Sequence, residues 1–184
     1  MGYRNDLLTS RSIIKHGNFA LITPEGLVNN VIPHFEKCTI SIICSPKLGA
    51  SFVEYLVNME PSGKNTVGFG GNGIETFVYV IEGNLDVFVN ETKYELTEGG
   101  YAYCPPSLNM IMENNSDKNV KFILYKQRYI NAEGVGEPWV VSNNVNNLNV
   151  VNYSDMKDVT MIDLLPTDHI HLLRPTFRNM VHIC

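Results

Sequence analysis

Hydrophobic residues recur at every second position in several short segments of the chain, and this period of two predicts β-strands. In residues 51–59, for example, Val53, Tyr55, Val57 and Met59 would share one face, and the residues between them would share the other. The segments are rich in Val, Ile, Phe and Tyr, which favour strands. We predict strands over 37–44, 51–59, 75–83, 84–90, 92–99, 108–114 and 120–127.

Turn-forming residues separate the predicted strands, and amphipathic segments of helical period are almost absent. Such a pattern predicts an all-β antiparallel sandwich or barrel. The Asn-rich residues 131–157 are poor in core-forming side chains and are interpreted as a connector. We therefore expect a barrel over 1–130, the connector, and the start of a second, incomplete barrel with an atypical tail over 158–184.

Composition excludes several functions. The 184 residues carry a net charge of −5, and the 14 Lys and Arg residues form no basic run, so a nucleic-acid partner is not expected. No stretch of 18 or more apolar residues is present, and the N-terminal residues are polar, so we predict a cytoplasmic protein without a membrane segment. The spacings of Cys38, Cys44, Cys104 and Cys184 suit neither a zinc site nor a disulfide framework, which predicts free thiols.

Two stretches resemble the sequence blocks of the cupin superfamily, G-x5-H-x-H-x(3,4)-E-x6-G and G-x5-P-x-G-x2-H-x3-N. In the second block Gly99, Pro105 and Asn114 are in register, and Met110 takes the His position. The first block ends at Gly83. Counting back from there places Thr76 at the Glu position and Gly70 and Asn72 at the His positions, or Phe69 and Gly71 with the longer spacing.

The resemblance implies a cupin-type antiparallel β-barrel, also called a double-stranded β-helix or jelly roll, whose metal ligands have been replaced. Gly70, Asn72, Thr76 and Met110 lack the imidazole and carboxylate groups that hold a divalent metal ion. We therefore expect that this chain binds no metal. The turn glycines and the proline of the blocks would remain because they set backbone geometry.

A possible ligand pocket involves Glu75, Tyr79, Tyr101 and Tyr103. By strand alternation Glu75 would point to the face opposite Thr76, toward solvent or a loop. The tyrosines, together with Phe69 and Phe77, would line or cap the barrel. Aromatic side chains on strands usually form core, but a cavity with tyrosine hydroxyls could also hold a small polar ligand.

The histidines are weak metal candidates. His169 and His171 form an H-x-H pair, but the residues three to five positions further on, Arg174, Pro175 and Thr176, include no carboxylate. His182 and Cys184 would supply only two ligands near the terminus. We interpret this tail as an exposed polar segment, and His16 and His34 as hydrogen-bonded structural residues.

Long stretches of the chain resemble the N-terminal half of (S)-ureidoglycine aminohydrolase, a two-cupin enzyme of purine (allantoin) catabolism. They are SRSIIKHGNFALITPEGLVNNVIPHFEKC, SPKLGASFVEYLV, GFGGNGIETFVYVIEGN, EGGYAYCPP and EPWVVSNN. The resemblance implies a hydrolase that converts ureidoglycine to ureidoglycolate and ammonia. It also implies that Mn²⁺ is bound in the second cupin and that the first cupin is metal-free.

The sequence reaches Cys184 before a second H-x-H block of the cupin type appears. We therefore expect the catalytic residues to lie in a missing second cupin and this chain to be inactive alone. The alternative is a non-catalytic cupin module for oligomerisation or small-ligand binding. In either case an unpaired apolar barrel face would favour a homo-oligomer.

Overall fold

The structure is a computed structural model, and it describes residues 12–15, 17–131, 136–152, 159–166 and 179–183. The helical elements of these residues are single 3-10 turns, η1 (Pro24–Gly26), η2 (Pro46–Leu48) and η3 (Val145–Asn147). None of the helices in this part of the chain has the length and apolar composition needed to cross a bilayer. The strands are β1 (Ile13–Lys15), β2 (Phe19–Leu21), β3 (Asn29–Asn30), β4 (Phe35–Cys44), β5 (Phe52–Asn65), β6 (Phe69–Gly70), β7 (Ile74–Glu82), β8 (Leu85–Val89), β9 (Thr92–Leu96), β10 (Gly100–Cys104), β11 (Asn109–Glu113), β12 (Val120–Arg128), β13 (Val141–Asn144), β14 (Val150–Asn152), β15 (Val159–Asp163) and β16 (Asn179–Ile183).

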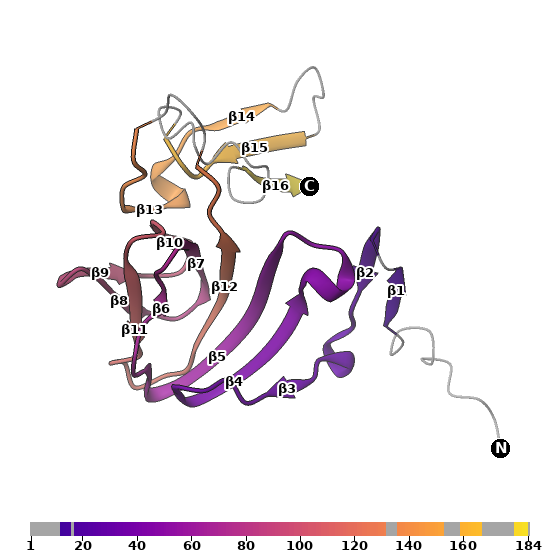
Figure 1. The fold of residues 1–184 in the computed structure, drawn as a ribbon, viewed down its shortest axis with the longest axis horizontal. Helices are drawn as coiled ribbons and strands as arrows, with labels where there is room; N and C mark the ends of the chain where they lie inside the picture. Colours follow the sequence, from indigo (N-terminus) through magenta and orange to yellow (C-terminus); the bar gives the residue numbers. More distant parts are fainter. Residues whose placement is uncertain (1–11, 16, 132–135, 153–158, 167–178, 184) are drawn as a thin grey trace.

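One antiparallel sheet of 11 strands forms most of the molecule (Figure 1). Its main path runs β13-β10-β7-β12-β5-β11-β8-β9, with β4 and β3 added beside β5 and β6 added beside β11. The sheet curls so that β8 and β11 face β4, β5 and β12 across a common interior (Figure 1). The hairpin β1-β2 and the sheet β14-β15-β16 are separate and lie at different ends of the molecule. The all-β prediction is confirmed.

The inner face of the curled sheet forms a continuous apolar core. Along β5, Tyr55, Val57 and Met59 point inward, as the alternation predicted. Along β8 the inward residues are Leu85, Val87 and Val89, which are all but inaccessible to solvent, while the residues between them are only partly buried. Full burial of a side chain of this size contributes about 1.5–3 kcal/mol, so this inner core is the main stabilising term of the barrel.

The turn-forming residues Pro61, Ser62 and Gly63 were expected to separate strands, but this is wrong, because they lie inside β5 as a bulge. Met59 pairs with Cys38 and Lys64 pairs with Glu36, so residues 60–63 oppose Lys37 alone. A Cβ atom at Gly63 would lie 2.5 Å from the Met59 Cγ atom, which explains why the bulge contains glycine. The Pro-Ser-Gly signal was correct about an irregular backbone but not about the end of the strand.

Asn114, the asparagine of the second cupin block, ties this bulge to the β11–β12 connection. Its side-chain amide donates to the carbonyls of Met59 (3.0 Å) and Lys118 (2.7 Å). Its side-chain oxygen accepts from the backbone N–H (3.1 Å) and the hydroxyl (2.7 Å) of Ser116. Its backbone N–H donates to the Gly63 carbonyl at 2.9 Å. Since the side chain is fully buried, no water can replace these bonds.

The predicted connector contains two strands that the sequence did not indicate, β13 and β14. Residues Val141–Asn144 form β13, which pairs with β10 at the edge of the main sheet. Asn144 holds the following turn: its side chain donates to the Glu98 carbonyl at 2.9 Å and accepts from the Asn146 N–H at 3.0 Å. Asparagine was interpreted as a sign of a loop, but here it caps a strand that packing against β10 stabilises. Further along, the segment interpreted as the start of a second barrel contains strand β15.

The hydrogen bonds of Asn114 predict a large stability loss on its removal. Asn114→Ala should lower the free energy of unfolding by about 2–4 kcal/mol, because two buried carbonyls lose their donor. The matched control is Asn115→Ala, at an exposed position whose amide donates to the carboxylates of Asp86 and Glu113 and whose loss should cost about 0.5 kcal/mol or less. Urea denaturation of the three proteins measures both values. Equal losses in the two variants would contradict this role.

Candidate functional site

The positions that hold the metal in a cupin barrel lie here on β6, β7 and β11. Gly70 and Thr76 are neighbours, since a Cβ atom at Gly70 would lie 3.0 Å from the Thr76 Cγ2 atom. Met110 is fully buried and pairs with Phe69, the residue before Gly70. The structure therefore gathers these three predicted positions around β6.

Asn72, the remaining position, lies in a loop in which residues 70–73 all have positive φ angles. It is exposed, and the structure does not bring it to the buried Thr76 and Met110. In the alternative register, Phe69 packs against the inner core and a Cβ atom at Gly71 would lie 2.5 Å from the Asn109 Oδ1 atom. Neither register therefore supplies a ligand at these places.

A lysine and a cysteine flank Thr76 on the neighbouring strands. Cys104 of β10 and Lys126 of β12 are its partners in the register. Burial raises the pKa of the Cys104 thiol to about 11, and the Thr76 hydroxyl offsets part of this rise. The Lys126 ammonium group lies over the rings of Phe69 (5.5 Å) and Tyr55 (5.6 Å). These contacts are cation–π interactions, and they place a positive charge at this end of the barrel.

These side chains do not fit a manganese ion. Mn²⁺ prefers carboxylate, imidazole and water ligands, whereas the positions offer a threonine hydroxyl, a thioether and a thiol that burial keeps protonated. The neighbouring ammonium group would also repel a divalent cation. Among the residues that the structure describes, no group of three His, Cys, Asp or Glu side chains could hold a metal ion.

The aromatic residues of the predicted pocket lie on the outer face of the sheet, not around the barrel interior. Phe77, Tyr101 and Tyr103 form a second buried cluster with Leu164 and Leu165, while Tyr79 packs at its margin. The rings of Phe77 and Tyr101 are stacked with centroids 5.7 Å apart. The prediction that these tyrosines line or cap the barrel was wrong. Alternation sends Val78 and Val80 inward, so their neighbours on β7 must face outward.

Glu75 lies on this outer face, opposite Thr76 as alternation predicted, but it does not face solvent. It is buried and its Oε2 atom accepts a hydrogen bond of 3.0 Å from the Tyr103 hydroxyl. Burial first, then the Glu75 charge and this hydrogen bond, raise the pKa of Tyr103 far above its usual value. Gln127 of β12, which pairs with Glu75 of β7, is buried with neither end of its amide hydrogen-bonded.

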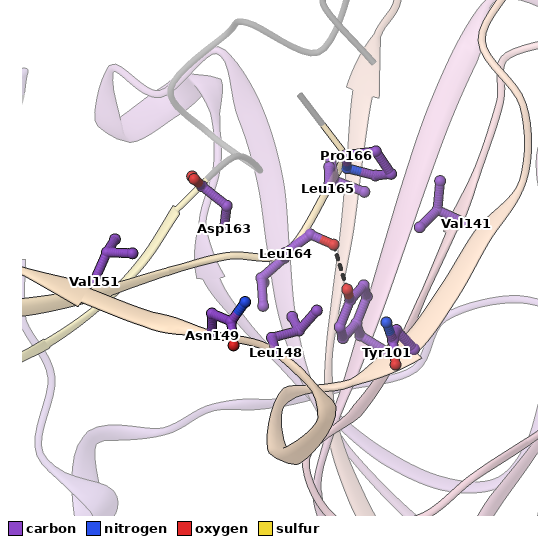
Figure 2. Close-up of a pocket in the computed structure, with 10 residues that line it drawn as sticks. Tyr101, Val141, Leu148, Asn149, Val151, Asp163, Leu164, Leu165 and Pro166 are labelled. Atoms are coloured by element: carbon purple, nitrogen blue, oxygen red, sulfur yellow. Dashed lines mark hydrogen bonds between the residues drawn. The ribbon is translucent and has the colours of Figure 1, made fainter. Parts of the chain in front are cut away.

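A pocket of about 300 Å³ opens where the C-terminal segment covers the outer face (Figure 2). The Tyr101 hydroxyl donates a hydrogen bond to the Leu164 carbonyl, and Leu148 packs beside the ring. Tyr101 is the residue of the predicted pocket that lines this space; Glu75, Tyr79 and Tyr103 do not line it. The pocket is mainly apolar, and Asn143, Asn149 and Asp163 are polar residues of its lining.

The structure tests few of the predictions made for the histidines. His16, His169, His171 and Cys184 lie outside the described residues, and for His182 only the backbone of β16 is described. His34 is exposed with a φ of 69°, and its carbonyl accepts a 2.8 Å hydrogen bond from Thr66. The thiols of Cys38, Cys44 and Cys104 are free, as predicted.

Sequence reasoning missed three residues. Lys126 lies on the inner face of the sheet, whereas Gln127 and Glu54 lie on its outer face, where Glu54 pairs with Tyr125. A signal for Lys126 was present, because it continues the inward series Val120, Phe122 and Leu124 of β12. No sequence signal marked Gln127 or Glu54, since their burial depends on distant segments that cover the outer face.

Comparison with known proteins agrees with the barrel. The cupin domain family matches residues 56–125. An (S)-ureidoglycine aminohydrolase of Escherichia coli strain K12 is 51% identical over 167 residues, which is 91% of this chain and 64% of that protein. The Arabidopsis thaliana (S)-ureidoglycine aminohydrolase is 27% identical over 65% of this chain and 39% of its own length. The chain therefore spans less than two thirds of these relatives.

Solved structures support the same relationship. The crystal structure of protein Ylba from E. coli has a TM-score of 0.79 and 49% identity, covering 90% of this chain and 65% of that one. A Pseudomonas aeruginosa protein described as glyoxylate-induced has a TM-score of 0.74 over 92% of this chain, but its 17% identity shows the fold alone. The cupin-type barrel predicted from the sequence is thus confirmed: residues 56–125 match the cupin domain family, and the chain is similar over 91% of its length to an (S)-ureidoglycine aminohydrolase.

Proposed function

We propose that this chain serves in the hydrolysis of (S)-ureidoglycine to ureidoglycolate and ammonia, a step of allantoin and purine catabolism, and that its described barrel is the metal-free cupin of that enzyme. The observation that carries the proposal is the 51% identity over 91% of the chain to the E. coli relative. The unpaired thiols of Cys38, Cys44 and Cys104 fit the reducing cytoplasm, which is the compartment we propose.

The reaction replaces a C–N bond by a C–O bond from water, and ammonia leaves with a proton. It needs a group that orients the substrate and stabilises developing charge, which is the role of Mn²⁺ in our proposal. Because the described residues do not fit that ion, we assign no step of the reaction to them. The role proposed for the barrel is to hold and position the catalytic domain.

A second candidate is a non-catalytic cupin module that assembles with itself or binds a small ligand. The observation that favours it is the apolar surface of the N-terminal region. Ile13, Ile14, Phe19 and Leu21 of the β1-β2 hairpin are between 48% and 59% exposed, and Val31 is 95% exposed. Exposed apolar groups concentrated in one region favour association.

A domain exchange tests the catalytic proposal. We expect that replacing the aligned residues of the E. coli relative by this chain preserves Mn²⁺-dependent ammonia release from freshly generated (S)-ureidoglycine. This chain assayed alone is the control, and it should release no ammonia above the spontaneous rate and hold no stoichiometric manganese. A folded but inactive exchange protein would contradict the proposal. Metal-dependent turnover by the chain alone would show that residues outside the described ones supply a site.

The former ligand position Thr76 gives a stability prediction. Its Oγ1 atom is buried and makes no hydrogen bond of good geometry, and its neighbour on β10 is the weakly hydrogen-bonding thiol of Cys104, so Thr76→Val should raise the free energy of unfolding by about 1 kcal/mol. Thr39→Val, on an exposed position of β4, is the control and should change it by about 0.5 kcal/mol or less. Urea denaturation distinguishes the two. A destabilised Thr76→Val variant would mean that the hydroxyl has a partner that matters.

The homo-oligomer is also a proposal, and light scattering tests it. We expect a mass of at least two chains at micromolar concentration. The double variant Phe19→Ser, Leu21→Ser removes apolar groups that are 48% and 59% exposed, so it should shift the mass toward the monomer. A monomeric parent protein would refute the proposal.

A further inference from the structure

A cavity of about 550 Å³ lies between the N-terminal segment and the outer face of β4, β5 and β12. This volume is within the range of sites for small organic molecules. Its walls are mainly apolar, with Leu21, Ile22 and Leu27 from the N-terminal segment facing Ile43 and Leu56 from the sheet. It is distinct from the pocket beside Tyr101 and from the former metal positions, which lie on the inner face.

Glu54 places a carboxylate in this apolar wall. It lies opposite Tyr125 on β12 and opposite Cys44 on β4. Its Oε1 atom accepts a 2.9 Å hydrogen bond from the Tyr125 hydroxyl. Burial raises the pKa of Glu54, and the Tyr125 hydrogen bond offsets part of that rise. The carboxylate therefore lies in surroundings that disfavour its charge unless a positive group approaches it.

No such positive group comes from the described residues of the chain itself. The ion pairs found there within 4.0 Å join Lys93 to Asp86 and Glu95, and none involves Glu54. Lys121 also lines the cavity, but it is exposed and lies four residues from Tyr125 on β12, about 13 Å along the strand. Glu54 is thus an acidic group in a cavity that has space for a cation beside it.

We propose that this cavity binds a small primary amine whose ammonium group pairs with Glu54 and whose apolar body packs between the N-terminal segment and Leu56. A hydrogen bond between an ammonium group and a carboxylate is stronger than one between neutral groups, and the half-buried position of Glu54 strengthens it further. The site is independent of the proposed hydrolysis, because it lies on the other face of the sheet.

Three probes of similar shape test the charge preference by calorimetry or NMR titration: 2-phenylethylamine, 2-phenylethanol and 3-phenylpropionate. We expect the amine to bind at least about tenfold more tightly than the alcohol, and the acid to bind most weakly. Glu54→Gln keeps the side-chain shape and should abolish the preference for the amine. The control Glu36→Gln, at an exposed position of β4, should retain it.

The reactivity of the Cys44 thiol can report where the amine binds, because this side chain lines the cavity. Saturating amine should slow alkylation of Cys44 in proportion to occupancy, as measured by peptide mass spectrometry. Cys38, which packs against the inner core, should react at an unchanged rate. Equal affinity for the three probes, a preference that survives in Glu54→Gln, or an unprotected Cys44 would each overturn the proposal.

Discussion

Strand β10 and the first half of β7 are buried on both faces, and this constraint accounts for most of the structure. Their inner face belongs to the barrel core, and their outer face is covered by the C-terminal segment through Leu164 and Leu165. All five residues of β10 are consequently buried. A strand in this position cannot follow the simple alternation of apolar inside and polar outside. Its outward residues are the aromatic side chains Tyr101 and Tyr103.

In a sheet that is buried on both faces, every enclosed polar group needs a hydrogen-bond partner within the protein. A buried polar group without a partner destabilises the fold, because water cannot reach it to form the missing hydrogen bond. Most of the enclosed polar groups have a partner. Asn114 satisfies backbone groups on the β5 bulge, and Asn65 joins β5 to β11 by donating to the Met110 carbonyl at 3.2 Å. Glu75 and Glu54 each accept from a tyrosine. Thr76 and Gln127 are the exceptions.

The barrel retains the backbone features of its family although its metal ligands are replaced. Gly83 has a φ of 87°, and a Cβ atom there would lie 2.8 Å from the Asn119 carbonyl oxygen, so the hairpin requires glycine whether or not a metal is present. Met110 and Thr76 instead take part in the filled, dry interior, and Lys126 adds a fixed positive charge beside them. Side chains that pack in the core therefore stand at the positions where metal-binding cupins have their metal ligands.

The sequence by itself determined seven strands of the barrel, though not the central strand β10, and it also determined the inward residues of β5 and β8, the barrel class and the replacement of the metal ligands. These follow from local periodicity and motif spacing, which a single chain displays directly. It did not reveal the bulge within β5, the strand β13, or the outward position of the tyrosines. Tertiary structure alone decided that Glu75 is buried and Glu54 half-buried, because segments more than 20 residues away in the chain cover the outer face. Burial of an outward side chain depends on what packs over it, and strand alternation carries no information about that cover.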